Sequence, residues 1–117
     1  MLFTQSLKKN YQFRYVYSRG RSIANRLLVM YCVRNGTQEN RYGISVSKKV
    51  GNSVVRSHLT RLLRESYRLS EDNIASGYDI VVIARASAKE ATYAEIESAL
   101  LNLLRKQRLL KSEQRTD

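Results

Sequence analysis

The sequence predicts one α+β domain, an α/β sandwich in which helices cover a single small sheet. The first observation is length, because 117 residues suit one domain and are too few for two cores of ordinary size. The second is composition, because 43% hydrophobic residues are enough for a core and exclude a wholly disordered basic chain. The third is the apolar pattern, which changes between helix and strand periods in the order αββαβα. Residues 1–117 are therefore treated as one domain, with a polar tail from about residue 111.

The first predicted element is a short helix that begins at Asn10, a residue type that caps helices well. Its apolar residues Phe13, Val16 and Tyr17 recur at i, i+3 and i+4. Gly20 stands where a helix C-terminus favours glycine. We therefore expect the helix to end at this glycine.

Two strands are expected next. Residues 25–33 (NRLLVMYCV) are an apolar run of β-prone residues, residues 34–40 (RNGTQEN) are typical of a turn, and residues 41–47 (RYGISVS) alternate like a strand. Two strands joined by a short turn predict a β-hairpin.

A helix, a strand and a final helix are expected in the second half. After Ser53, one side of the first of these helices carries apolar residues at 3.6 spacing, namely Val55, Leu59, Leu62, Leu63 and Leu69. Residues 78–84 (YDIVVIA) have the continuous apolar centre of a strand buried in the middle of a sheet. From about Lys89 a long amphipathic helix is expected, with Tyr93, Ile96, Leu100, Leu103 and Leu110 on its apolar side.

The positive charge is concentrated in the first two-thirds of the chain. The formal net charge is +11, yet residues 1–68 hold 14 basic and 2 acidic residues, whereas residues 69–117 hold 7 and 8. Charge that served only solubility could be spread anywhere, so this asymmetry favours one binding surface for an anionic partner. A sequence pI of 10.2 is typical of a nucleic-acid-binding domain.

The second predicted helix carries arginines on the side opposite its leucine stripe, as a helical wheel shows. The basic residues of this region are Lys48, Lys49, Arg56, Arg61, Arg64 and Arg68. A solvated charged face normally mixes signs, but here only Glu65 is acidic. Guanidinium groups one turn apart match phosphates, so contact with a phosphate backbone is favoured over a merely solvated face.

Three aromatic residues are candidates for stacking on unpaired bases: Phe13, Tyr17 and Tyr31. Helical spacing by itself favours core packing for such rings, so the residues alone leave both interpretations open. Ser45 and Ser47, next to Lys48, are suited to donate hydrogen bonds to phosphate oxygens.

No pattern in the sequence predicts catalysis or metal binding by the protein itself. Paired carboxylates, a phosphate-cradling glycine loop, a nucleophile elbow and a metal-ligand cluster are all missing from it. His58, the single histidine, has no acidic neighbour within a turn to orient it as a general base. Cys32, the single cysteine, is expected to be a small buried hydrophobe in a reducing compartment. With no signal peptide and no membrane span, the sequence predicts a cytoplasmic protein.

Several motifs together closely resemble the protein component of bacterial ribonuclease P. They are residues 7–10 (LKKN) with Phe13 and Gly20, residues 24–26 (ANR), and residues 43–56 (GISVSKKVGNSVVR). Residues 79–85 (DIVVIAR) and the helix of Tyr93 also stand where that family has them. The resemblance covers almost the whole chain.

The resemblance implies the protein subunit of a ribonucleoprotein endoribonuclease that removes the 5′ leader from precursor tRNA. In this family the RNA subunit and its bound Mg²⁺ ions do the chemistry, and the protein alone is not catalytic. The implied partners are the RNA subunit and precursor tRNA, with no membrane and no DNA. The family fold also implies a small mixed sheet with a left-handed crossover between parallel strands, against a rule obeyed in about 98% of cases.

The resemblance also implies roles for single residues. A groove for the leader would be formed by Phe13, Tyr17, Tyr31, Ser45, Ser47 and Lys48. Contacts with the RNA subunit would come from Lys49, Asn52, Arg56, Ser57, His58, Arg61, Arg64 and Arg68.

The chain departs from the family within its arginine-rich signature. The family usually has Arg-Asn-Arg-x-Lys-Arg, whereas residues 56–61 are RSHLTR, so Ser57, His58 and Thr60 replace an amide and two cations. Each lost phosphate contact weakens binding and lowers the slope of log affinity against log salt concentration by about 0.7 to 0.9. We expect weaker assembly with the RNA subunit than the full signature gives, with Arg68 as the residue that could offset the loss.

A second hypothesis from another class is a non-enzymatic RNA-binding module, such as a ribosomal or assembly protein. Fold and charge do not separate the two, but the signature over residues 47–56 and a dependence of leader cleavage on the protein do. A protein nuclease acting alone would need a base and metal carboxylates in one site, which ten scattered acidic residues do not form.

Overall fold

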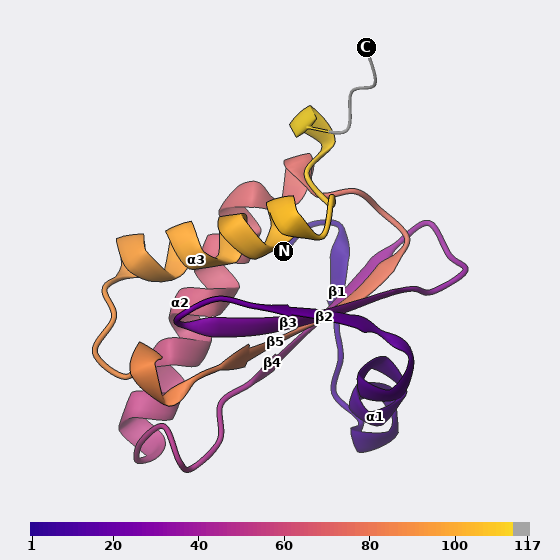
Figure 1. Ribbon diagram of the computed structural model, residues 1–117. Helices are drawn as coiled ribbons and strands as arrows, with labels where there is room; N and C mark the ends of the chain where they lie inside the picture. The colour runs from indigo at the N-terminus through magenta and orange to yellow at the C-terminus, as the bar shows by residue number, and fades with distance from the viewer. Residues whose placement is uncertain (114–117) are drawn as a thin grey trace.

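The computed structural model describes residues 1–113 as a five-stranded mixed sheet covered by helices on both faces (Figure 1). The strands are β1 (Thr4–Ser6), β2 (Arg21–Ala24), β3 (Leu28–Arg34), β4 (Asn40–Ser45) and β5 (Tyr78–Ala84). The helices are α1 (Asn10–Arg19), α2 (Ser53–Ser70) and α3 (Tyr93–Lys106), with short 3-10 turns η1 (Glu71–Asn73), η2 (Ala86–Ala88) and η3 (Lys111–Glu113). The predicted α+β class is confirmed. The remainder of the predicted polar tail, residues 114–117, lies outside the described residues.

The β-hairpin predicted from residues 25–33 and 41–47, which contain most of β3 and β4, is wrong. The sheet order is β1-β4-β5-β3-β2, so β5 lies between β3 and β4 and pairs antiparallel with β3 and parallel with β4. The reason is that β5 is apolar on both faces and almost wholly buried, and such a strand needs a neighbour on each side. The parallel strands β4 and β5 are joined through α2, and the hand of this crossover stays a prediction.

Two strands were not expected from the sequence. β1 and β2 form the two edges of the sheet and have 3 and 4 residues. Most of their side chains are exposed, so they lack the apolar alternation that reveals a strand. Short polar edges are a common way to protect a sheet from further pairing.

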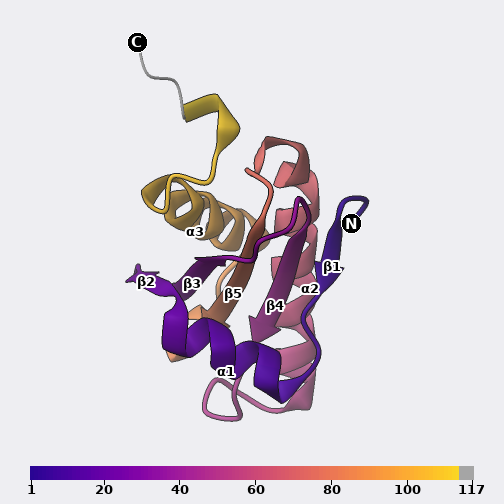
Figure 2. The same cartoon turned by 90° about the vertical axis from the view of Figure 1, so that its right-hand side faces the viewer.

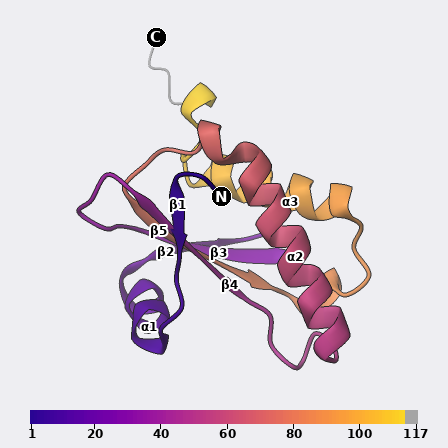
Figure 3. The same ribbon diagram turned by 180° about the vertical axis from the view of Figure 1, so that it is seen from behind.

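The helices divide the sheet into two unequal cores. α2 and α3 pack on one face over the larger core, and α1 crosses the other face (Figures 1 and 3). Strand alternation separates the two, because Ile80 and Val82 of β5 belong to the larger core whereas Val81 packs with Leu7 and Val16 under α1.

α1 has the predicted extent but not the predicted cap. Lys9 is the N-cap, and Gln12 Oε1 accepts hydrogen bonds from the Lys9 and Lys8 amides at 2.9 and 3.0 Å. Asn10 is therefore the first helical residue and not the cap. Gly20 ends the helix as predicted, and its amide donates to Val16 O at 2.7 Å.

The buried face of α2 turns along the helix. Its early turns bury Leu59 and Leu62, whereas its end buries Tyr67 and, just beyond, Glu71. At about 100° per residue these positions lie on progressively rotated sides of the helix. Leu69, expected in the leucine stripe, is left on the far side and is 60% exposed, so that prediction is wrong.

The last helix is shorter than expected at both ends. It begins after Thr92, which forms a capping box with Glu95, and ends at Lys106. Arg108 has a φ of 60°, which a helix cannot accommodate. Leu110 is consequently not helical but forms a bridge with Ile74 and is buried in the larger core.

A buried carboxylate joins three elements at the end of the sheet away from the β4–α2 loop. Asp79 is 1% exposed and accepts two hydrogen bonds from the Arg41 guanidinium at 2.8 and 2.7 Å. Asn35 Nδ2 donates a third at 3.0 Å. Because Asn35 belongs to the β3–β4 loop, the cluster holds that loop over the start of β5.

Glu71 anchors the N-terminal strand. Its carboxylate oxygens accept hydrogen bonds from the Leu2 and Phe3 amides at 2.8 and 3.1 Å. Burial by itself would raise the pKa of Glu71, but the Thr4 hydroxyl and these two amides together lower it below its ordinary value of 4.5. The ionised carboxylate is therefore the form that stabilises the fold.

Glu71→Gln is expected to destabilise the protein by about 1 to 3 kcal/mol at neutral pH, since two amides in partly buried hydrogen bonds lose a charged acceptor. A group with a lowered folded pKa stabilises above its unfolded pKa and loses that effect as pH falls through the folded pKa. The difference in Tm between wild type and variant should thus shrink below about pH 4.5. Asp72→Asn, an exposed neighbour, is the matched control. A pH-independent difference would contradict the assignment.

Candidate nucleic-acid interface

Three predicted aromatic residues come together between α1 and the sheet. The Phe13 and Tyr17 rings are 6.4 Å apart between centroids, and Tyr17 meets Tyr31 of β3 edge-on at 5.1 Å. All three pack against the small core under α1, yet each remains partly exposed. The rings thus contribute to packing and still offer surface to a ligand.

An open groove of about 430 Å³ runs beside these rings. Its lining residues are Asn10, Phe13, Arg14, Tyr17, Ile44 and Ser45. Three of the predicted leader residues, Phe13, Tyr17 and Ser45, therefore share the groove. Tyr31 contacts the Tyr17 ring but does not line the groove. Ser47 and Lys48 are exposed just after β4.

Sequence reasoning missed Asn10, Arg14 and Ile44 as groove residues. A signal for two of them was present, because residues 10, 14 and 17 are spaced i, i+4 and i+7 and so share one helix face. No local signal pointed to Ile44, whose place in the groove depends on how α1 crosses the sheet.

Gly43 sets how closely α1 approaches β4. A Cβ atom at this position would lie 2.8 Å from both Cε1 and Cζ of Phe13, well inside van der Waals contact. A glycine within a strand often marks such a close approach. The bare backbone therefore lets the Phe13 ring lie against the strand, beside the groove residues Ile44 and Ser45.

The predicted arginine face of α2 is present, but its members differ. Arg61 and Arg64 are exposed, and neither forms an ion pair within residues 1–113. Arg68 instead donates two hydrogen bonds to Glu65 Oε2, which, with its charge, lower the pKa of Glu65. Arg56 is partly buried, and its Nε has no hydrogen-bond partner in the described chain.

Two of the three departures from the family signature, Ser57 and His58, lie on one hollow of about 520 Å³ near the start of α2. Ser57, His58 and Arg61 line it together with Ser53 and Val54. His58 Nδ1 lies 3.4 Å from Arg61 Nη2.

Thr60 and Asn52 both direct side-chain bonds to the backbone of α2. The Thr60 hydroxyl donates to Arg56 O at 2.8 Å. Asn52 caps the helix by accepting from the Val55 amide at 3.0 Å. Of the predicted RNA-subunit contacts, Asn52 therefore has a structural task as well.

The groove and the arginine face meet at one end of the sheet. β4 ends at Ser45 beside the groove, and α2 begins at Ser53, so the loop with Lys48 and Lys49 connects the two surfaces directly (Figure 3). Both lysines are exposed. The fold thus places the two exposed lysines between the aromatic groove and the start of the arginine-bearing helix.

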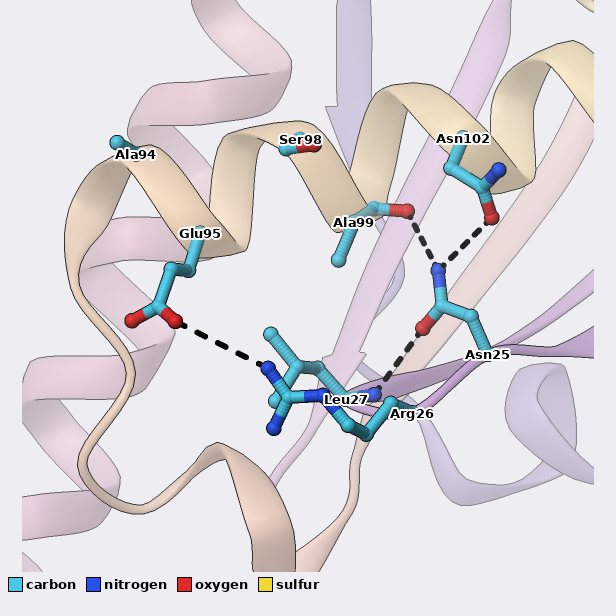
Figure 4. Close-up of a pocket in the computed structure, with 8 residues that line it drawn as sticks. All are labelled: Asn25, Arg26, Leu27, Ala94, Glu95, Ser98, Ala99 and Asn102. Atoms are coloured by element: carbon cyan, nitrogen blue, oxygen red, sulfur yellow. Dashed lines mark hydrogen bonds and ion pairs between the residues drawn. The ribbon is translucent and has the colours of Figure 1, made fainter.

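Another hollow, of about 470 Å³, lies between residues 25–27 and α3 (Figure 4). Its polar groups are engaged with one another: Asn25 Nδ2 donates to Ala99 O and Asn102 Oδ1, and Arg26 lies 3.8 Å from Glu95. These contacts tie the β2–β3 turn to α3.

Residues 1–113 contain neither a cluster of metal-ligating side chains nor a helix suited to a bilayer. No three His, Cys, Asp or Glu side chains gather there as a metal site would require. None of the helices in that range has the length and apolarity needed to cross a bilayer.

Known proteins resemble the chain over most of its length. A family model described as Ribonuclease P matches residues 1–108. The ribonuclease P protein component of Alkaliphilus metalliredigens is 58% identical over 110 residues, covering 94% of this chain and 99% of the relative. That of Clostridium botulinum strain Langeland is 54% identical over 101 residues, covering 86% and 91%.

Two solved structures share the fold. The RNase P protein of Staphylococcus aureus superposes with a TM-score of 0.84 and 39% identity, covering 90% of this chain and 96% of that one. The RNase P protein of Thermotoga maritima gives a TM-score of 0.80 and 31% identity, covering 87% and 96%.

Proposed function

This chain belongs to the ribonuclease P protein family, and on that basis we propose that it binds the catalytic RNA subunit and the 5′ leader of precursor tRNA. The observation that carries the proposal is the junction of an aromatic groove with a basic helix at one end of the sheet. In the holoenzyme the leader would be removed in the cytoplasm by endonucleolytic cleavage, giving the mature tRNA 5′ end.

The groove suits the single-stranded leader. Exposed parts of Phe13 and Tyr17 offer faces on which unpaired bases stack without regard to sequence. The Ser45 hydroxyl and the Arg14 guanidinium in the same groove suit phosphate oxygens. Single-stranded RNA offers both unpaired bases for the aromatic rings and phosphates for the polar side chains of this groove.

The arginine face of α2 suits the phosphate backbone of a folded RNA subunit. Arg61 and Arg64 stand exposed on one side of the helix, and Lys49 precedes it. Arg68 would have to exchange its Glu65 pair for a phosphate, so we assign it a smaller contribution than the other two arginines. Ser57 and His58 offer a hydroxyl and an imidazole where the family signature has an amide and a guanidinium.

In this proposal the chemistry belongs to the RNA subunit, with Mg²⁺ bound there. The residues from 1 to 113 do not fit a metal site, so no step is assigned to a protein-bound ion. The protein holds the leader beside the RNA and adds positive charge where RNA strands converge.

The proposal is tested by cleavage of a precursor tRNA at low Mg²⁺ concentration. Cognate RNA subunit alone, protein alone and the two together are compared. We expect efficient cleavage only with both, and none with the protein alone. If the protein adds nothing, the chain is an RNA-binding module of another kind.

Restoring the family signature is expected to strengthen assembly with the RNA subunit. The variant combines Ser57→Asn, His58→Arg and Thr60→Lys and so adds two cations beside Arg61. The slope of log affinity against log salt concentration should therefore steepen by about 1.4 to 1.8. The measurement is RNA-subunit affinity over a range of salt concentrations. Asp72→Asn with Glu90→Gln, both exposed, is the control that changes net charge equally elsewhere. Equal gains in the two variants would refute a local effect.

A further inference from the structure

α1 carries a second pair of aromatic residues that the groove does not use. Tyr11 is 63% exposed and Tyr15 is 47% exposed, although large aromatic side chains usually bury most of their surface. Their spacing of i and i+4 places them on one side of the helix. That side is turned away from Val16, by about 140° for Tyr11 and about 100° for Tyr15, and Val16 is fully buried against the sheet.

No other described element covers this outer side. Figure 2 shows α1 in front of the sheet, with no other helix or strand in front of it. The two tyrosines therefore form an exposed aromatic stripe, defined here as Tyr11 and Tyr15. Core packing, which accounts for Phe13 and Tyr17 in part, does not account for this stripe.

The charge around the stripe is positive. The Arg19 guanidinium lies 5.7 Å from the centroid of the Tyr15 ring, within cation–π distance. The sequence of α1 contains Arg14 and Arg19 and no acidic residue. Aromatic faces beside arginines are the combination with which proteins hold single-stranded nucleic acid.

We propose that nucleotides of the leader upstream of those in the groove stack on the Tyr11 and Tyr15 stripe. This inference rests on the proposed function, because it continues the path of the same leader. It makes α1 an aromatic platform on two sides, with the groove on one side and the stripe on the other.

Arg14 connects the two sides. It lines the groove, and at about 100° per residue it lies between Tyr17 on one side of α1 and Tyr11 on the other. A strand that leaves the groove over Arg14 can keep a phosphate on its guanidinium while the next bases reach the stripe. The groove and the stripe are thus one route and not two separate sites.

Other occupants fit less well. A second copy of the chain would bring a net charge of +11 against a surface without acidic residues. A helical segment of the RNA subunit offers phosphates, which suit arginines but leave the tyrosine faces without a partner. Unpaired leader nucleotides satisfy both the rings and the arginines.

The experiment measures the affinity of the reconstituted holoenzyme for precursor tRNAs whose leaders are lengthened one nucleotide at a time. Wild type should gain affinity first as the leader fills the groove and again as it passes Arg14. Tyr11→Ala with Tyr15→Ala should remove only the second gain, a loss of about fivefold or more for long leaders. Tyr11→Phe with Tyr15→Phe should keep it, because the rings remain.

The controls separate the possible failures. Leu69→Ala removes an exposed apolar side chain from α2, across the sheet, and should leave both gains intact. A wild type without leader-dependent affinity would overturn the proposed function itself. If wild type shows both gains, the proposal for the stripe is overturned when the variant with both alanines keeps the second gain. It is also overturned when that variant loses RNA-subunit affinity at every leader length, or when it changes only self-association.

Discussion

A holoenzyme carrying Phe13→Ala is expected to bind precursor tRNA about tenfold or more weakly, with its affinity for mature tRNA unchanged. The reason is that one base stacked on an aromatic ring contributes about 1 to 3 kcal/mol, and each 1.4 kcal/mol is about tenfold in affinity. The Phe13 ring lines the groove and is partly exposed. The measurement is the ratio of the two dissociation constants at one salt concentration.

The control for this variant is Phe3→Ala, which removes the same side chain from a site where it is 61% exposed and outside the groove. Gly43→Ala supplies a second test, because its methyl group would meet the Phe13 ring at 2.8 Å and displace it without removing it. Gly43→Ala should likewise weaken the binding of precursor tRNA relative to that of mature tRNA. If neither Phe13→Ala nor Gly43→Ala changes the ratio, the leader does not stack on Phe13.

Arg41→Ala is expected to cost about 3 kcal/mol of folding stability. Removing one partner of a buried ion pair typically costs about 3 to 5 kcal/mol, and the lower end applies because the Arg41 side chain is 38% exposed. The Asp79 carboxylate, 1% exposed, would keep only its bond from Asn35. The expected fall in Tm is on the order of 10 °C, measured by thermal unfolding of the free protein.

A double variant distinguishes a stranded charge from lost packing. Arg41→Ala with Asp79→Asn leaves no buried charge in this cluster, so it should be more stable than Arg41→Ala alone. If the double variant is the less stable of the two, the cost arises from the missing arginine stem and not from the carboxylate. RNA-subunit affinity should be unchanged in both, since the pair lies at the other end of the sheet from the β4–α2 loop.

Local pattern identified the main helices and strands because each signal is contained within a few neighbouring residues. The 3.6-residue spacing in α2 and the apolar run of β5 report burial directly. Where burial was slight the signal failed, as in the edge strands β1 and β2. Where the buried side turned along a helix, a fixed wheel misplaced Leu69.

The candidate site was predicted in the same uneven way. The motif over residues 43–56 pointed to the basic loop and helix, and the structure places them together. It could not show that Arg68 pairs with Glu65 or that Thr60 bonds to the helix backbone. Such bonds depend on side-chain geometry, for which several arrangements of the same sequence are possible.

The sequence by itself determined the α+β class, the concentration of positive charge before residue 69 and the family to which the chain belongs. The tertiary structure alone decided that β5 separates β3 from β4, and that Phe13 lies on Gly43 beside Ile44 and Ser45. The physical reason is the separation along the sequence of the residues that interact. Periodicity and charge are properties of neighbouring residues, whereas strand order and groove lining depend on which distant surfaces bury each other best.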